Sequence, residues 1–195
     1  MARWICLIDK LRGCNAAKAA PTMVIDDNFF VGAALAAFKL GSLTMAYDDL
    51  RKGRFSENGR AYFVTTVLAN RNARYFENFK CARLVVQNMK LLHEQKIIYS
   101  MAWVVMPDHL HWLFQLGETT KSLSEIVGIF KGRSAREINS YLGKSGRLWQ
   151  RNFYDHALRE EEDVQSIARY IVANPLRANL VKNISDYSHW DAIWL

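Results

Sequence analysis

The segment Met101–Leu116, with the sequence MAWVVMPDHLHWLFQL, constrains the fold more than any other part of the chain. Its two apolar halves are separated by Pro107 and Asp108, so the segment predicts two strands joined by a tight turn. Because side chains alternate between the faces of a strand, His109 and His111 lie on the same face. Two imidazoles on one face are typical of a divalent metal site, although an isolated pair more often has a structural role in a core or hairpin.

The composition indicates a globular protein with a polyanionic partner. Half of the 195 residues are hydrophobic, which suits one domain with a full core. The net charge of +7 favours nucleic acid or an anionic membrane surface. The basic residues form no single run or amphipathic helix, and no stretch of about 20 apolar residues occurs, so we expect no membrane partner. Three widely spaced cysteines without a CxxC motif predict reduced thiols in a cytosolic protein.

The first 44 residues differ from the rest of the chain. The sequence that follows, MAYDDLRKGRFSENGRAYF, itself resembles a protein start, which suggests Met45 as the natural initiator. We therefore predict that residues 1–44 are a weakly packed N-terminal extension and that residues 45–195 form the functional domain.

The pattern of apolar residues after Met45 predicts alternating strands and helices. Strands are expected at 61–68, 101–106 and 109–116 and at the end of a loop within 148–159, and helices at 78–95, 120–142 and 161–174. The order β-α-β-β-α-β-α is that of a ferredoxin-like split βαβ arrangement. We therefore predict an α+β fold with an antiparallel four-stranded sheet, two helices on one face and an additional C-terminal helix.

The additional helix carries two polar residues at helical spacing. Tyr170 and Asn174 lie one turn apart on one face, while Ile167 and Ile171 belong to the apolar stripe. Taken alone, the tyrosine is explained by packing at a helix edge and the asparagine by the end of the helix before Pro175.

Several segments together resemble the REP-associated tyrosine transposases, a branch of the single-tyrosine HUH transposases. The matching segments are GRAYFVTTV, VVMPDHLHWLF, LWQRNFYDHALR and the stretch ending in YIVANPLRA, which span nearly all of the chain after Met45. One departure is Asp108, where many relatives have Asn, and residues 1–44 have no counterpart.

The resemblance implies a set of catalytic roles. His109, His111 and Asn174 correspond to the metal ligands, and Tyr170 to the nucleophile that keeps the DNA phosphate as a covalent ester. Such a donor set suits Mg²⁺ or Mn²⁺, which would polarise the phosphate for attack by a phenol. His156 also matches a recurrent position, where it contacts phosphate, moves a proton, or has only a structural hydrogen bond.

The resemblance and the distribution of charge also predict where DNA binds. The expected contacts are in the basic lead-in before the first strand, on the exposed face of the second long helix, and in the following loop: Arg51, Lys52, Arg54 and Arg60; Lys131, Arg133 and Arg136; and Arg151. In relatives the lead-in is associated with reading a short tetranucleotide beside a hairpin.

The predicted function is that of a metal-dependent single-strand DNA endonuclease and strand transferase, acting on hairpin-forming repeat DNA through a 5′-phosphotyrosine. Two alternatives stay open: a DNA- or RNA-binding regulator that has lost turnover, and an unrelated metal hydrolase in which Tyr170 is inert. The resemblance further predicts a bacterial, cytoplasmic and nucleoid-associated protein, with either a monomer or a homodimer as its functional form.

Overall fold

The computed structural model describes residues 56–194. The predictions for residues 1–44, and for Arg51, Lys52 and Arg54, therefore lie outside the described residues. The elements follow in the order β1 (Ala61–Val67), η1 (Arg71–Ala73), η2 (Tyr75–Glu77), α2 (Phe79–Glu94), β2 (Ile98–Met106), β3 (His109–Leu116), α3 (Leu123–Leu142), β4 (Tyr154–Ala157), α4 (Val164–Val172), α5 (Asn174–Arg177), η3 (Ile184–Asp186) and β5 (Trp190–Ala192).

The strands form one antiparallel sheet in the order β4-β1-β3-β2-β5. The predicted α+β fold is confirmed, but the described residues contain five strands, so the predicted count of four is wrong by one. The extra strand, β5, has three residues and pairs with the outer edge of β2. Its shortness explains why the sequence did not reveal it, because alternation over three residues is no signal.

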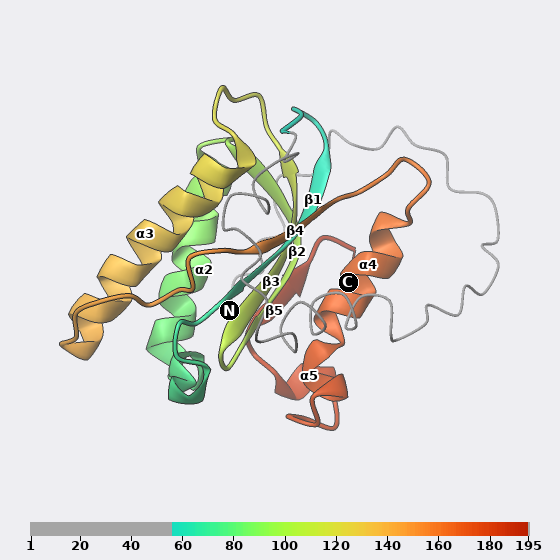
Figure 1. Cartoon of the computed structure of the whole chain (residues 1–195). Helices are drawn as coiled ribbons and strands as arrows, with labels where there is room; N and C mark the ends of the chain where they lie inside the picture. Colours follow the sequence, from blue (N-terminus) through green and yellow to red (C-terminus); the bar gives the residue numbers. More distant parts are fainter. Residues whose placement is uncertain (1–55, 195) are drawn as a thin grey trace, which may run out of the picture. The chain divides into compact units, whose positions relative to one another are not determined.

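The two faces of the sheet are covered by different helices (Figure 1). Alternate residues of β3, including Trp112, pack with α2 and α3 in the larger hydrophobic core. The residues between them face the opposite side, where Leu113 packs with Ile167 and Ile171 of α4 in a second, smaller core. The histidine pair belongs to this second face, since His111 lies opposite Thr65 and Leu113 lies opposite Phe63 in β1.

Local sequence sets the ends of the long helices. Asn78 caps α2, and Ser122 caps α3 in a capping box that Glu125 completes. The α3 helix ends at Leu142 and is capped by Gly143, whose positive φ of 61° is a conformation that glycine adopts without strain.

The C-terminal helix departs from the prediction of one helix at 161–174. Asp163 caps α4, which ends at Val172, and a second short helix, α5, begins at Asn174. Pro175 therefore stands in the first turn of α5, where its missing N–H costs no helical hydrogen bond. None of the helices within residues 56–194 has the length and apolar character needed to cross a membrane.

Candidate active site

The two histidines of β3 converge on one point. Their Nε2 atoms lie 3.1 Å apart, and both rings are half-buried. Two nitrogen ligands about 2.1 Å from one octahedral ion, at a right angle to each other, would be separated by about 3 Å. The spacing therefore fits two ligands of the same metal ion.

The opposite ring nitrogens are held by side chains around the pair. The Nδ1 atom of His109 lies 2.6 Å from Oδ1 of Asp108, and the Nδ1 atom of His111 lies 2.8 Å from Oγ1 of Thr65. With the proton on Nδ1, each imidazole directs the lone pair of Nε2 toward its neighbour. This arrangement of supporting side chains is typical of metal-binding histidines.

The surroundings of the pair favour the ionised form of Asp108 and the neutral form of His111. Burial alone would raise the pKa of Asp108, but hydrogen bonds and charges from His109 and Arg71 hold it well below its usual value. Arg71, the first residue of η1, donates from Nε to this carboxylate. Burial, followed by the charges of His109 and Arg177, lowers the pKa of His111 well below its usual value. A neutral imidazole is the form that binds metal.

The α4 and α5 helices carry a polar stripe on the same side of the sheet, and α4 contacts both β2 and β3. The stripe consists of Tyr170, Asn174 and Arg177, at positions i, i+4 and i+7. Ala173, between the two helices, keeps right-handed helical dihedrals, so the stripe continues across the break. The amide nitrogen of Asn174 donates to the carbonyls of Tyr170 and Ile171, which leaves its side-chain oxygen as the atom suited to bind metal.

Arg177 is a site residue that the sequence analysis missed. Its Nη2 atom donates to the hydroxyl of Tyr170 at 2.8 Å, and its Cζ atom lies 3.9 Å from the centre of the tyrosine ring. The spacing of seven residues from Tyr170 was the available signal. It was obscured because Pro175 was taken as the end of the helix.

No cluster of three or more His, Cys, Asp and Glu side chains within residues 56–194 is arranged to hold a metal ion. A site built on His109 and His111 would therefore draw a further ligand from another residue type. The amide oxygen of Asn174, predicted as the third ligand, meets this requirement chemically.

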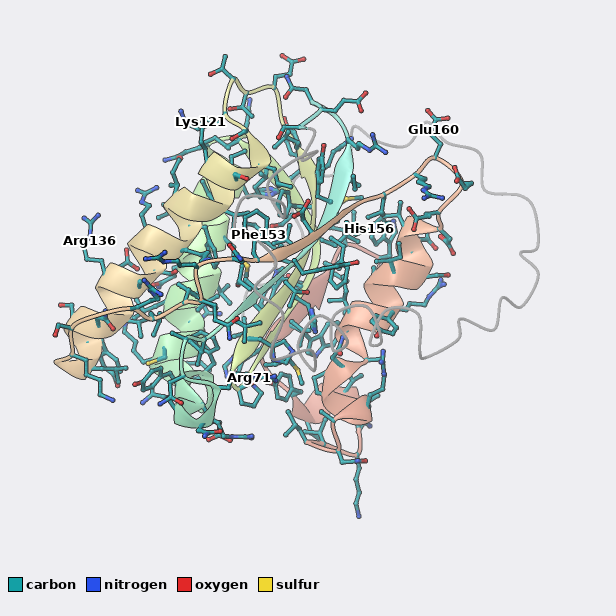
Figure 2. The ribbon with its side chains drawn as sticks, viewed as in Figure 1. Arg71, Lys121, Arg136, Phe153, His156 and Glu160 are labelled. Atoms are coloured by element: carbon teal, nitrogen blue, oxygen red, sulfur yellow. The ribbon has the colours of Figure 1, made fainter. Side chains whose placement is uncertain are left out.

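His156 lies on the face of the sheet that carries the histidine pair. This residue of β4 pairs with Phe63 of β1, and Figure 2 shows it between the sheet and α4. Its Nε2 atom is 2.8 Å from Oε1 of Glu162, whose other oxygen accepts a hydrogen bond from the backbone N–H of Arg159. These contacts tie β4 to the loop before α4. They favour the structural interpretation of His156 over the catalytic one.

The predicted DNA contacts on α3 fall into two groups. Lys131 extends its Nζ atom to the backbone carbonyls of Gln150, Arg151 and Asn152, at 2.6, 2.9 and 3.3 Å. The structure thus gives Lys131 a role in holding the chain that leads into β4. Arg136 instead projects from the outer side of α3 (Figure 2).

The remaining predicted contacts differ in position. Arg133 is half-buried on α3, and Arg151 is exposed in the loop before β4. Arg60 precedes β1 and donates to the carbonyl of Leu158 and to Glu57. It therefore stands at the opposite end of β1 from the residue that pairs with His109.

Comparison with known proteins agrees with this geometry. Residues 60–174, more than half of the chain, match the family described as "Transposase IS200 like". A REP-associated tyrosine transposase from Escherichia coli (strain K12) is 27% identical over 135 residues, which cover 69% of this chain and 77% of the relative. A Haemophilus influenzae protein provisionally named as the same kind of transposase is 24% identical over 144 residues, covering 67% and 78%.

A solved structure supports the same assignment. It is that of a REP-associated tyrosine transposase bound to a REP hairpin, with a TM-score of 0.59 and 25% sequence identity, covering 70% of this chain and 79% of the other. The resemblance inferred from the four sequence segments is confirmed. The chain belongs to the IS200-like transposase family, and within it the chain is similar to the REP-associated tyrosine transposases.

Proposed function

We propose that the chain is a metal-dependent single-strand DNA endonuclease and strand transferase that acts on hairpin-forming repeat DNA through a 5′-phosphotyrosine intermediate. The observation that carries the proposal is the convergence of Nε2 of His109 and Nε2 of His111 at 3.1 Å. A second observation supports it: Tyr170 lies on α4, and α4 packs against β3, the strand that carries both histidines.

The donor set suits Mg²⁺ or Mn²⁺. Two imidazoles and one amide oxygen, from His109, His111 and Asn174, leave coordination positions for phosphate and water. The bound ion would supply Lewis-acid polarisation of a non-bridging phosphate oxygen. Asp108 and Thr65 keep the imidazoles in the orientation and tautomer that this binding needs.

Tyr170 serves as the nucleophile in this proposal. Its phenolic oxygen forms a bond to the phosphorus of the scissile phosphate, and the bond from phosphorus to the 3′-oxygen breaks. The product is a 5′-phosphotyrosine and a free 3′-OH, so the energy of the phosphodiester is retained. Attack by another 3′-OH then joins strands without an external energy source.

The proposed substrate follows from the relatives and from charge. The related transposase of known structure is bound to a REP hairpin, and this chain carries a net charge of +7. A basic protein of this family is suited to bind the phosphates of a DNA hairpin and its single-stranded flank. Its action as a homodimer stays a prediction.

The test is covalent capture of DNA. The full chain is incubated with Mn²⁺ and labelled single-stranded hairpins taken from the repeats of its own genome, and protein–DNA adducts are resolved on a denaturing gel. We expect an adduct that Tyr170→Phe abolishes while its hairpin affinity stays within about twofold. His109→Ala and His111→Ala should also abolish it, because each removes a metal ligand.

Two outcomes would contradict the proposal. Hairpin binding by the wild-type chain without any adduct would indicate a non-catalytic regulator. Cleavage that persists in Tyr170→Phe would indicate a metal hydrolase in which the tyrosine is inert.

A further inference from the structure

The contact between Arg177 and Tyr170 combines two interactions in one pair of side chains. The guanidinium lies over the tyrosine ring, with 3.9 Å between its Cζ atom and the ring centre. The same guanidinium reaches the edge of the ring, where Nη2 donates to the hydroxyl at 2.8 Å. Arg177 thus contacts both the aromatic face and the oxygen atom of this tyrosine.

Backbone geometry holds the two residues in this relation. The N–H of Arg177 bonds to the carbonyl of Ala173, which continues the helical spacing across the α4–α5 break. The position of Pro175 in the first turn of α5 allows the turn to form without the loss of a helical hydrogen bond. Arg177 consequently lies two turns from Tyr170 on the same stripe as Asn174.

The guanidinium also acts on the metal-binding side of the site. Its charge is among the causes that lower the pKa of His111. Arg177 therefore lies near enough to His111 for its charge to act there while it contacts Tyr170. The hydrogen bond from Arg177 places a fixed positive charge at the phenol oxygen, where negative charge gathers when the phenol ionises.

We propose that Arg177 is a catalytic residue that binds the oxygen of Tyr170 and stabilises its negative charge, an inference that rests on the nucleophilic role of Tyr170 in the proposed function. Arginine stays protonated at any working pH, so Arg177 cannot accept the phenol proton. It acts as a fixed donor to the oxygen, in the manner of an oxyanion hole.

The charge is needed in both directions of the reaction. In cleavage, the phenol loses its proton to solvent, the oxygen of Tyr170 bonds to phosphorus, and the departing 3′-oxygen takes a proton from water. In rejoining, a 3′-OH attacks phosphorus and loses its proton to solvent, and the bond from phosphorus to the tyrosine oxygen breaks. Arg177 holds the phenolate that leaves until it regains a proton from water.

A structural role alone would predict different behaviour. A cation stacked on an aromatic ring contributes little to stability when it is exposed, as Arg177 is. Loss of such a contact would lower stability slightly and would leave the dependence of the rate on pH unchanged. The pH profile of adduct formation therefore separates the two roles.

The experiment measures the rate of adduct formation as a function of pH with the labelled hairpin and Mn²⁺, using Arg177→Met, Arg177→Gln and wild type. We expect both variants to be slower by about 100-fold at neutral pH and to recover as the pH rises, because hydroxide then ionises the phenol. Arg169→Met is the matched control, since Arg169 lies on α4 and bonds to Gln165. It should retain the wild-type rate.

A second measurement replaces Tyr170 with 3,5-difluorotyrosine, whose phenol is more acidic. In the Arg177 variants this replacement should raise the rate of adduct formation about tenfold at neutral pH, since a more acidic phenol needs less stabilisation. Rates and pH profiles equal to wild type, or a loss that neither pH nor fluorination relieves, would overturn the role of Arg177. Adduct formation by Tyr170→Phe would instead refute the proposed function itself.

Discussion

Thr65 and Thr66 are adjacent in β1, yet their hydroxyl groups have different surroundings. Thr65 bonds to Nδ1 of His111, whereas the buried hydroxyl of Thr66 has no hydrogen-bond partner among the described residues. Removal of the Thr65 hydroxyl should therefore free the ring of His111 to rotate. Removal of the Thr66 hydroxyl should break no hydrogen bond.

This difference gives a prediction with a built-in control. Thr65→Val should weaken Mn²⁺ binding by about tenfold, because the partners of metal-binding histidines fix their tautomer and orientation. Thr66→Val should bind Mn²⁺ as wild type does. Calorimetric titration of each variant with Mn²⁺ measures both affinities. Equal affinities for the two variants would mean that the Thr65 hydroxyl does not orient His111.

The residues of the site differ in how well sequence predicts them. His109 and His111 were predicted because strand alternation places them on one face and the family resemblance assigns them as metal ligands. Thr65 was not, because it is 46 residues away from His111 and only the register of β1 with β3 brings the two together. Arg177 was missed for a local reason, since the helix was expected to end before Pro175.

Among the elements, α3 presents two similar cations with different roles. Lys131 donates to three consecutive backbone carbonyls of the loop before β4, whereas Arg136 is exposed on the outer side of the helix. A helical pattern cannot distinguish them, because the aliphatic stem of a lysine can turn toward a segment that follows much later.

The two residues therefore give opposite predictions. Lys131→Met should lower the free energy of unfolding by about 1–3 kcal/mol, because it leaves carbonyls without their charged donor. Arg136→Met should leave stability unchanged and weaken hairpin binding through the loss of a phosphate contact. Urea unfolding and hairpin titration of both variants check this. A stability loss in Arg136→Met as large as that in Lys131→Met would contradict the distinction.

The limits of prediction for the elements follow the same physical rule. The long helices and the central hairpin were predicted because their apolar periodicity extends over many residues. The strand β5 and the short helix α5 were not predicted, since each has only a few residues; β5 pairs with β2, and α5 contacts the same strand. Tertiary contacts decide such short elements.

At the largest scale, the sheet of the described residues has its larger core on one face and the candidate site on the other. One face carries the larger core beneath α2 and α3, and the other carries the histidine pair and the α4–α5 stripe. Arg60 precedes β1, and His109 pairs with Val67 at the other end of that strand, so at about 3.3 Å per residue the two lie roughly 23 Å apart along it. A DNA strand that contacts both Arg60 and the candidate metal site must therefore extend along the sheet.

The basic residues in the lead-in and those on α3 should affect DNA binding in different ways. Arg51→Ala and Arg54→Ala, in the lead-in before Arg60, should weaken binding to the cognate hairpin more than to one with a scrambled flank, because a base contact carries sequence information. Arg133→Ala and Arg136→Ala should weaken both alike and reduce the slope of log affinity against log salt by about one unit per contact.

Titration of both hairpins over a salt series measures the two effects together. If the lead-in reads bases, Arg51→Ala and Arg54→Ala should lower the ratio of cognate to scrambled affinity at every salt concentration. The ratio reports base contacts because the phosphate contacts shared by the two hairpins cancel in it. If the lead-in binds only phosphates, the same variants should leave this ratio equal to that of wild type and change only the slope of log affinity against log salt. Equal losses on the two hairpins in the Arg51 and Arg54 variants would therefore show that the lead-in binds phosphates alone, and that sequence is read elsewhere on the sheet.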